Sequence, residues 1–482
     1  MSRARALGRA LIVAAVAGLV AAGSAAAHGA LRASRPAAGA VLDTVPRVLR
    51  LTFTERVELA VATLALTGAD GRAVALSPLR LVPDSAQVLV ADVVGALGAG
   101  KYTVAWQVAG RDGHPVRGRF AFTVAAAAQG TTKAATQLPP PAPSPADRVA
   151  DPPPPADRVG PAAGAPPDRP VFDAGSPLYA ALRWVGLLAL VPLVGVVAFR
   201  WLVLRPLGTA EGGAHAGLAT AAEVRARAMG LALGGVVAAS LLARLVAQGA
   251  AAFGVGGALD AGRLVRLVTG TGWGTGWLLQ AVGLALLVGA LALARRSRGV
   301  AGWPLAALAT VVIAVGSALS GHAAAQPLAG VAVASDALHL LAAAGWLGTL
   351  LVVLAAGLPA AHRLDEAARL RGGAALVRAF SRAALVCAAV VAVTGAVNGW
   401  LELRELGALW TTAYGRTLLV KLALLAPVAL LGAYNWRRVV PTLDSDGGGV
   451  ARLRRTATLE VAFGALVLLV TAVLVATPTP HE

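Results

Sequence analysis

Cysteine and methionine are almost absent from this chain of 482 residues. Its one cysteine, Cys387, excludes an internal disulfide and any CxxC metal or redox motif. The two methionines are the initiator and Met229, so thioether ligation of a soft ion such as Cu(I) is almost unavailable. The P-loop pattern G-x-x-x-x-G-K-[ST] is also missing, which argues against transport driven by ATP.

Charged residues are scarce, and acidic residues are the scarcest. The chain has 24 Asp and Glu against 42 Lys and Arg, a net charge of +18, yet only 14% of residues are charged and 57% are hydrophobic. A mean hydropathy of +0.71 is too high for a soluble globular protein and predicts a chain embedded in a lipid bilayer. Most basic residues stand in short loops between apolar runs, where they set membrane orientation, so we expect no nucleic-acid partner.

Residues 1–27 have the pattern of a secretory signal peptide. Three arginines precede the apolar run 10–22, and small residues fill positions 24–27. Cleavage after Ala27 would make His28 the first residue of the mature chain. The adjoining sequence would then lie outside the cytoplasm.

Residues 28–124 alternate between apolar and polar side chains, as in 48–53 and 119–124, with Gly and Asp turns between such runs. This pattern predicts an all-β domain, a small sandwich or barrel of the immunoglobulin-like or cupredoxin-like Greek-key type. Residues 125–176 are rich in Pro and Ala and cannot build a core. They predict an extended, semi-rigid linker.

Residues 177–482 predict an all-α polytopic domain of about eight transmembrane helices. Each apolar segment is long enough to cross a hydrocarbon core of about 30 Å. The segments are 178–204, 228–252, 275–294, 301–320, 331–357, 375–399, 416–435 and 458–477. Most loop arginines fall on the side that a secreted N-terminal domain assigns to the cytoplasm, whereas Arg263, Arg266, Arg404 and Arg416 fall on the other side. We therefore expect the cytoplasmic membrane, with both mature ends outside.

His28 and three later residues are candidate metal ligands. A histidine at a free N-terminus offers its α-amino nitrogen and its imidazole Nδ1 together, a chelate that suits Cu(II). Asp112 and His114 flank Gly113 on a turn between two strands, and Glu55 stands at a strand end. A motif such as His114-Pro115 by itself is usually a surface turn, but its coincidence with a histidine at the cleavage point favours a tetragonal N,O site.

The membrane region has candidate ligands of its own. Asp336 and His339 are three residues apart and share a helix face, and His322 follows the fourth span on the same outer side. Ionisable residues in a membrane segment are costly, which favours a function, with a structural ion pair or packing contact as the alternative. Arg244, Lys421 and Glu460 have no assigned role.

The β-region resembles a known family through the run that begins His28-Gly-Ala-Leu31, through Leu51-Thr-Phe53-Thr-Glu55 and through Asp112-Gly-His114-Pro-Val-Arg-Gly118. The whole of 28–124 is similar to the CopC family of copper-resistance β-barrels. The resemblance implies that His28, Asp112, His114 and often Glu55 bind Cu(II). Because 28–124 contains no methionine, a single Cu(II) site without a Met-rich Cu(I) site is expected.

The helical region resembles the CopD family of polytopic copper-resistance proteins. The shared residues are Gly321-His322, Asp336-x-x-His339 with Trp346 and Gly348, Thr394-Gly395-x-x-Asn398, and Tyr414-Gly-Arg-x-Leu418-x-x-Lys421. A joined CopC-CopD chain resembles proteins implicated in copper uptake. The resemblance implies a copper-binding transporter in copper homeostasis or resistance, not an enzyme, with a path through His322, Asp336 and His339. A periplasmic copper chaperone is the expected protein partner.

Two other functions stay open. His322 and His339, from adjacent spans, are also a candidate haem pair, or neighbours of a quinone in a redox protein that reduces or hands on copper. An N-terminal histidine chelate with a second histidine also occurs in copper monooxygenases. However, Asp112 would occupy coordination space that such enzymes need open.

If the α-amine of His28 is a copper ligand, one residue retained ahead of it will remove that ligand. A mature chain that keeps Ala27 before His28 is expected to lose high-affinity Cu(II) binding with every side chain intact. Calorimetric titration with Cu(II) against the chain that begins at His28 measures this. Equal affinities would show that the α-amine takes no part.

Overall fold

The computed structural model describes residues 31–83, 85–126, 176–209, 215–296, 301–442, 449–477 and 479–480. The expected signal peptide, His28 and nearly all of the expected linker lie outside these ranges. Within them, the chain forms two compact units. One contains the β-strands, and the other contains the helices together with Gly110–Pro115.

The β-unit consists of two sheets. The four-stranded sheet has the order β1 (Leu31–Arg35), β3 (Val48–Phe53), β7 (Ser85–Asp92) and β6 (Arg80–Val82). The five-stranded sheet has the order β2 (Val41–Leu42), β9 (Pro115–Val124), β8 (Gly100–Ala109), β4 (Thr63–Gly68) and β5 (Ala73–Val74). Strand β2 pairs parallel with β9, whereas β3 pairs antiparallel with β1 and β7. A 3-10 helix, Leu59–Val61, precedes β4.

The core of the β-unit follows from the alternation along its strands. In β3, Leu49, Leu51 and Phe53 are buried, while the residues between them face outward or lie partly exposed. Phe53 meets Trp106 of β8 edge to face, with ring centroids 5.2 Å apart. This edge-to-face contact adds to the stability that burial of the two rings provides.

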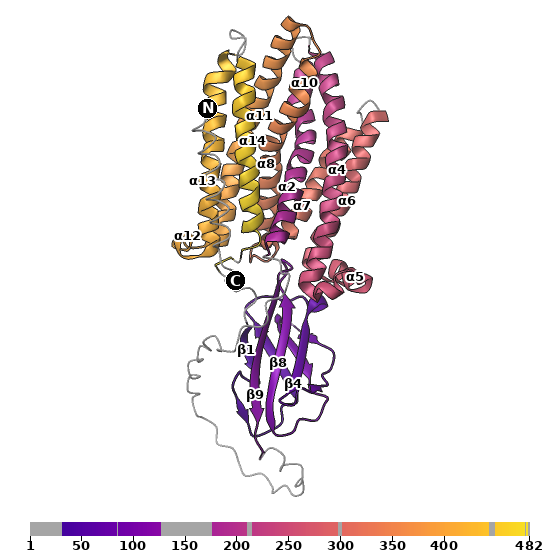
Figure 1. Ribbon diagram of the computed structural model, residues 1–482, viewed down its shortest axis with the longest axis vertical. Coiled ribbons are helices and arrows are strands. Elements are labelled where there is room, and N and C mark those ends of the chain that lie inside the picture. The colour runs from indigo at the N-terminus through magenta and orange to yellow at the C-terminus, as the bar shows by residue number, and fades with distance from the viewer. Residues whose placement is uncertain are drawn as a thin grey trace, which may run out of the picture. The chain divides into compact units, whose positions relative to one another are not determined.

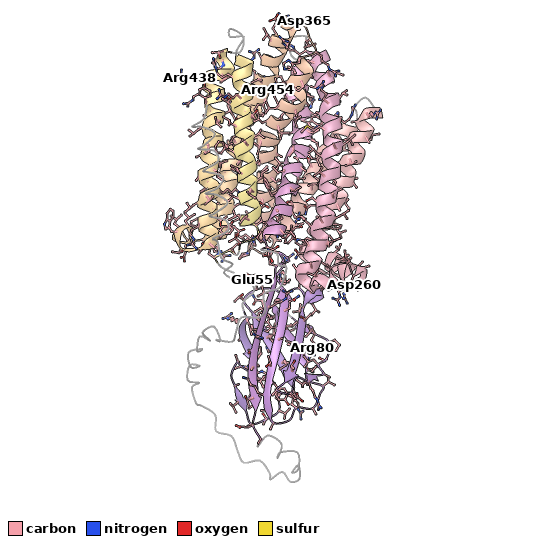
Figure 2. The ribbon with its side chains drawn as sticks, viewed as in Figure 1. Glu55, Arg80, Asp260, Asp365, Arg438 and Arg454 are labelled. Carbon is pink, nitrogen blue, oxygen red and sulfur yellow. The ribbon has the colours of Figure 1, made fainter. Side chains whose placement is uncertain are left out.

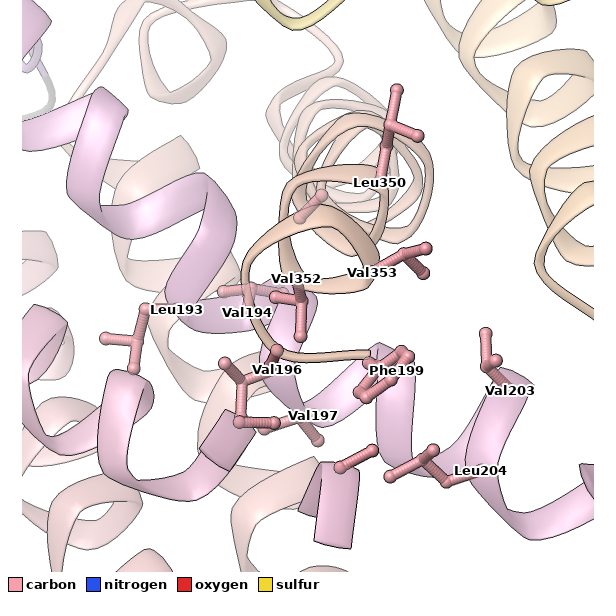
Figure 3. Close-up of a cluster of buried hydrophobic side chains, with 14 of the residues drawn as sticks. Leu193, Val194, Val196, Val197, Phe199, Val203, Leu204, Leu350, Val352 and Val353 are labelled. Carbon is pink, nitrogen blue, oxygen red and sulfur yellow. The ribbon is translucent and has the colours of Figure 1, made fainter. Parts of the chain in front are cut away.

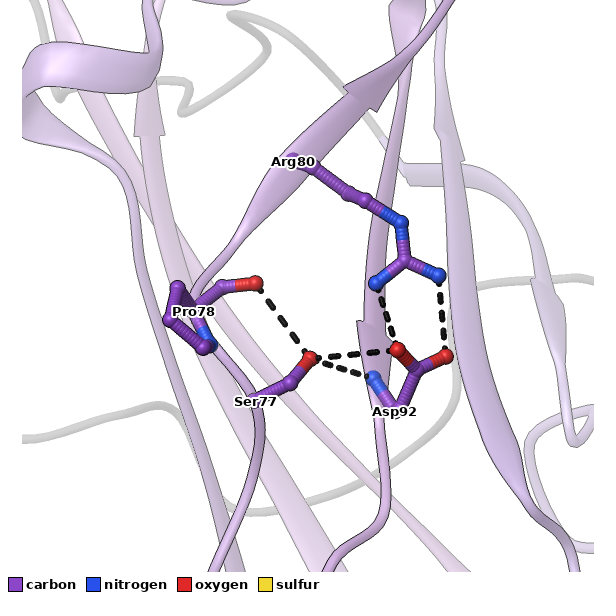
Figure 4. A network of polar contacts seen from close by, with 4 residues as sticks. All are labelled: Ser77, Pro78, Arg80 and Asp92. Carbon is purple, nitrogen blue, oxygen red and sulfur yellow. Dashed lines mark hydrogen bonds and ion pairs between the residues drawn. The ribbon is translucent and has the colours of Figure 1, made fainter.

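Strand β6 is fixed to its neighbour by a polar network at the sheet edge (Figure 4). Arg80 Nη1 and Nη2 donate to the two carboxylate oxygens of Asp92, at 2.6 and 2.9 Å, and Ser77 Oγ accepts from the Asp92 N–H at 2.8 Å. The hydrogen bonds from Arg80 lower the pKa of the Asp92 carboxyl. Because the pair is exposed, it orders the edge more than it stabilises the unit.

The helical unit has eight helices long and apolar enough to span a membrane, as predicted (Figure 1). Their main α-helices are α2 (Pro177–Ala198), α4 (Ala216–Phe253), α6 (Gly272–Arg296), α7 (Gly302–Leu319), α8 (Ala329–Ala343), α11 (Glu366–Leu403), α13 (Ala413–Tyr434) and α14 (Gly449–Leu474). Shorter α-helices are α3 (Arg205–Thr209), α5 (Ala261–Gly270), α9 (Thr349–Val352), α10 (Leu358–Ala361) and α12 (Ala408–Thr411). The β-strands followed by these helices confirm the predicted fold class, and the chain is a multi-pass membrane protein.

Several spans extend beyond one α-helix because π-helical turns continue them. These turns are Phe199–Leu204, Ala344–Gly348, Val353–Gly357 and Asn435–Val439. Short 3-10 helices at Val255–Gly257, His322–Ala324 and Val440–Thr442 lie at span ends. Isolated π-helical turns in α-helices are frequent at functional sites, and three of these four carry residues discussed below, namely Arg200, Trp346 and Asn435.

The core of the helical unit is built around α2 and its π-helical extension. Leu193, Val196, Phe199 and Val203 are fully buried, and Val352 of α9 packs into the same cluster (Figure 3). Gly195 of α2 meets Gly348 so closely that a Cβ on either residue would collide with the other helix's backbone. Small residues at such a crossing let two membrane helices approach and pack.

The two ends of the bundle differ in charge. Arg438 and Arg454 lie at one end together with Asp365, and Asp260 lies at the opposite end (Figure 2). The first end also carries Arg437 and Arg452, both exposed. This end is called the arginine-rich end below.

Gly195→Ala is expected to lower the free energy of unfolding by about 1–3 kcal/mol, because the added methyl group overpacks the crossing. Gly235→Ala on α4 is the control, since a Cβ there meets nothing within 4 Å. Thermal unfolding in detergent, followed by circular dichroism, measures both. Equal losses for the two variants would contradict the tight crossing.

Candidate metal centre

The turn Asp112-Gly113-His114 has a conformation that its central glycine permits. Gly113 has φ +80°, in the left-handed region, and its N–H donates to the Gly110 carbonyl at 3.0 Å. The His114 N–H donates to Asp112 Oδ1 at 3.1 Å. A Cβ on Gly113 would lie 2.8 Å from Cβ and Cγ of Trp273 on α6. Both backbone conformation and space therefore require glycine here.

Hydrogen bonds from α2 and α4 hold this turn within the helical unit. Gln248 Nε2 of α4 donates to the Gly113 carbonyl, and Tyr179 of α2 donates to Gln248 Oε1 at 2.7 Å. The Arg183 guanidinium lies 4.3 Å from the centre of the Tyr179 ring. Tyr179, Gln248 and Trp273 were not among the predicted site residues. Polar Gln248 within an apolar span is the one signal in the sequence that marks this position.

His322 is placed by the end of α7. The helix stops at Leu319, and a 3-10 turn, His322–Ala324, follows. Ser320 anchors this end, because its hydroxyl accepts from Gln280 Nε2 at 3.1 Å and lies 3.3 Å from the Trp273 carbonyl. Trp273 thus contacts the Gly113 turn with its side chain and the base of the His322 turn with its backbone.

Asp112, His114 and His322 form a buried cluster. Asp112 Oδ2 lies 2.6 Å from His114 Nδ1 and 3.2 Å from His322 Nδ1. The two imidazole rings stack, with centroids 5.3 Å apart and planes at 10°. Possible ligand atoms from the three side chains all lie within 4.8 Å of one another. One carboxylate and two imidazoles therefore converge on a single point.

Charge complementarity stabilises the Asp112 carboxylate. Burial by itself would raise the pKa of Asp112, but the charge and hydrogen bond of His114, with those of His322, hold that pKa well below its usual range. Asp112 is thus an anion between two imidazoles. A buried anion with two nitrogen donors is a suitable N,O ligand set for a divalent ion such as Cu(II).

The roles of the other two predicted ligands of the β-domain, Glu55 and His28, stay predictions. Glu55 follows β3 and, within the described residues, is not part of the three-residue cluster. His28 lies outside the described residues, so its role stays a prediction. His322, which the sequence grouped with Asp336 and His339, forms a cluster with Asp112 and His114 and also interacts by charge with Asp336.

Asp336 and His339 belong to a second polar group between α8 and α11. Asn398 Nδ2 lies 3.5 Å from Asp336 Oδ1, and His339 Nδ1 lies 2.9 Å from Thr394 Oγ1. Asp336 also interacts by charge with Lys421 of α13 and with His322. The shared face predicted for Asp336 and His339 thus turns toward α11.

Three family models match successive parts of the chain. Residues 31–125 match the CopC domain, residues 173–332 match the N-terminal domain of copper resistance protein D-like proteins, and residues 374–474 match copper resistance protein D. Copper transport protein CutJ of Bacillus subtilis (strain 168) is 29% identical over 215 residues. That match covers 44% of this chain and 38% of CutJ, so the chain spans well under two thirds of that relative.

Two further similarities fall on the β-unit. Protein YobA of Escherichia coli (strain K12) is 31% identical over 98 residues, covering 20% of this chain and 79% of YobA. The crystal structure of CopC from Methylosinus trichosporium OB3b is 28% identical, covers 20% of this chain and 94% of that chain, and has a TM-score of 0.19. With CopC and both CopD segments in one polypeptide, the chain belongs to the CopC/CopD copper-resistance family.

Proposed function

We propose that this protein captures Cu(II) outside the cytoplasm and moves copper across the cytoplasmic membrane, with import as the direction. The observation that carries the proposal is the convergence of Asp112, His114 and His322 within 4.8 Å. In this proposal residues 28–124 form the copper-binding domain, 125–176 the linker and 177–482 the membrane domain. His28 completes the site as a further nitrogen ligand, and Glu55 is a candidate oxygen ligand.

The donor atoms favour copper in its oxidised form. Two imidazoles and a carboxylate are borderline and hard ligands, which suit Cu(II), whereas Cu(I) prefers thiolates and thioethers. Cys387 is the one thiol of the whole chain, and Met229 is its one methionine after the initiator. His322 Nδ1 lies 3.2 Å from Asp112 Oδ2, and this contact argues against a haem bound between His322 and His339.

A path from the cluster into the bundle is supported by charge. Asp336 interacts electrostatically with His322 and stands one helical turn before His339 on α8. Gly395 of α11 leaves room beside His339, since a Cβ there would lie 3.3 Å from His339 Cε1. We propose that copper passes from His322 to Asp336 and then to His339.

Orientation follows from the distribution of arginine. We propose that the arginine-rich end, with Arg438 and Arg454, faces the cytoplasm and that the opposite end faces outward. His322 follows α7 at that outward end in this proposal, where copper delivered by a chaperone arrives. The protein acts as a transporter in copper homeostasis and resistance and performs no chemical conversion.

His322→Ala in the purified full chain is expected to weaken Cu(II) binding by at least about 10-fold, because one imidazole ligand is lost. His362→Ala is the matched control, since His362 is exposed and lies beyond α10. Competition titration against a Cu(II) chelator gives both affinities. An unchanged affinity in His322→Ala would remove His322 from the site.

His339→Ala is expected to lower copper accumulation in copper-limited cells to that of cells without the protein, because it interrupts the path after the binding site. Asp336→Asn is expected to act in the same direction, and His362→Ala is expected to leave accumulation unchanged. Total cell copper, normalised to the amount of protein in the membrane, is the measurement. Normal copper accumulation in His339→Ala would contradict the proposed path along α8. Higher accumulation would indicate export in place of import.

A further inference from the structure

Glu460 is a carboxyl group buried within a membrane span. It lies on α14, in the candidate span Arg452–Leu474, and its exposed fraction is 3%. Trp346 Nε1 donates to Glu460 Oε1 at 3.0 Å, and Asn435 Nδ2 donates to Oε2 at 3.3 Å. Both donors lie on π-helical turns, Ala344–Gly348 and Asn435–Val439. Neither donor carries a charge.

Glu223 of α4 provides a direct contrast within the same bundle. It also accepts a hydrogen bond from a tryptophan, Trp303 Nε1, at 3.0 Å. Its second oxygen, Oε2, lies 2.9 Å from Arg200 Nε. A guanidinium stays charged at any working pH, so Glu223 has a permanent cation beside it. The second carboxyl oxygen of Glu460 has the neutral amide of Asn435 as its partner, whereas that of Glu223 has the Arg200 guanidinium.

The charged groups nearest in sequence to Glu460 and Asn435 are exposed, whereas Glu460 is buried. On α14, Arg452, Arg454 and Arg455 are exposed, and on the Asn435–Val439 turn Arg437 and Arg438 are exposed as well. From α2, Trp184 donates to the Ala465 carbonyl. Among the described residues no cation lies within 4.0 Å of Glu460. An ionised carboxyl without a cation is costly in a membrane interior, whereas a protonated one is not.

The hydrogen bonds around Glu460 can be satisfied in both of its protonation states. In the ionised form, Trp346 and Asn435 donate to the carboxylate, and Thr456 Oγ1 donates to Asn435 Oδ1 at 2.5 Å. If the Asn435 amide turns by half a rotation, its oxygen faces Glu460 and accepts from the protonated carboxyl. Its NH2 group then donates to Thr456, whose hydroxyl has the Leu453 carbonyl as an alternative acceptor at 3.0 Å.

We propose that Glu460 is a proton-binding site of this protein and that it exchanges its proton with the solvent at the arginine-rich end of the bundle. The network leads from buried Glu460 through Asn435 to Thr456, which is partly exposed and lies two residues after Arg454 on α14. The Asn435 amide acts as the switch, because it donates to the ionised carboxyl and accepts from the protonated one. This site does not require copper, so it can be tested independently of the proposed copper-binding function.

Infrared difference spectroscopy of the purified, copper-free full chain in lipid tests this site. On acidification the wild type is expected to gain a carbonyl band from a protonated carboxyl group. The band is expected to be lost in Glu460→Gln and kept in Glu223→Gln, the matched control. Identical pH-difference spectra for the wild type and Glu460→Gln would overturn the proposal.

Trp346→Phe keeps the carboxyl group and removes one of its donors, so the proposal can be tested even if Glu460→Gln fails to fold. A protonated Glu460 that loses the indole hydrogen bond is expected to show its carbonyl band at a higher frequency. The band is expected to stay in place in Trp303→Phe, the equivalent change at Glu223. A band at the same frequency in Trp346→Phe and the wild type would show that it does not arise from Glu460.

Discussion

The Asp112 carboxylate between two imidazoles is the interaction on which the candidate metal centre depends. It exists because the Gly113 turn fits against Trp273 and because Gln248 holds the Gly113 carbonyl. Any side chain at Gly113 would meet both an unfavourable φ and the indole. The Asp-Gly-His motif therefore serves two purposes: it presents two ligands, and it gives the turn the one residue that fits its place.

A second constraint is the absence of water in the bilayer core, where polar groups need partners within the protein. Several buried polar side chains of the spans satisfy this constraint in small groups. Gln280 bonds Ser320 and the Gly316 carbonyl, Asp336 lies beside Asn398, and Glu223 pairs with Arg200. Each group joins different helices, so the groups fix helix packing as well as supplying sites for ions or protons.

The fold was largely predictable from sequence because its signals are local. Alternation in residues such as Leu49, Leu51 and Phe53 marks a half-buried strand, and apolar runs of membrane length mark the spans. The Asp112-Gly113-His114 motif was likewise visible as a turn between two strands. These features depend on neighbours along the chain, which a single sequence displays.

The composition of the site was less predictable because it depends on contacts between distant segments. Nothing near His322 in the sequence indicates that it meets Asp112 rather than His339. Trp273 and Gln248 carry no motif, and their roles depend on the position of the Gly113 turn. Glu460 had no assigned role for the same reason, since its partners Trp346 and Asn435 come from two other helices.

The central claim is that His322 of the helical unit and His114 bind the same copper ion. Pulsed electron paramagnetic resonance on the Cu(II)-loaded full chain tests it, because the remote nitrogen of each coordinated imidazole modulates the signal. His322→Ala is expected to lose the modulation of one imidazole and to keep that of His114. Equal modulation in His322→Ala and the wild type would contradict it.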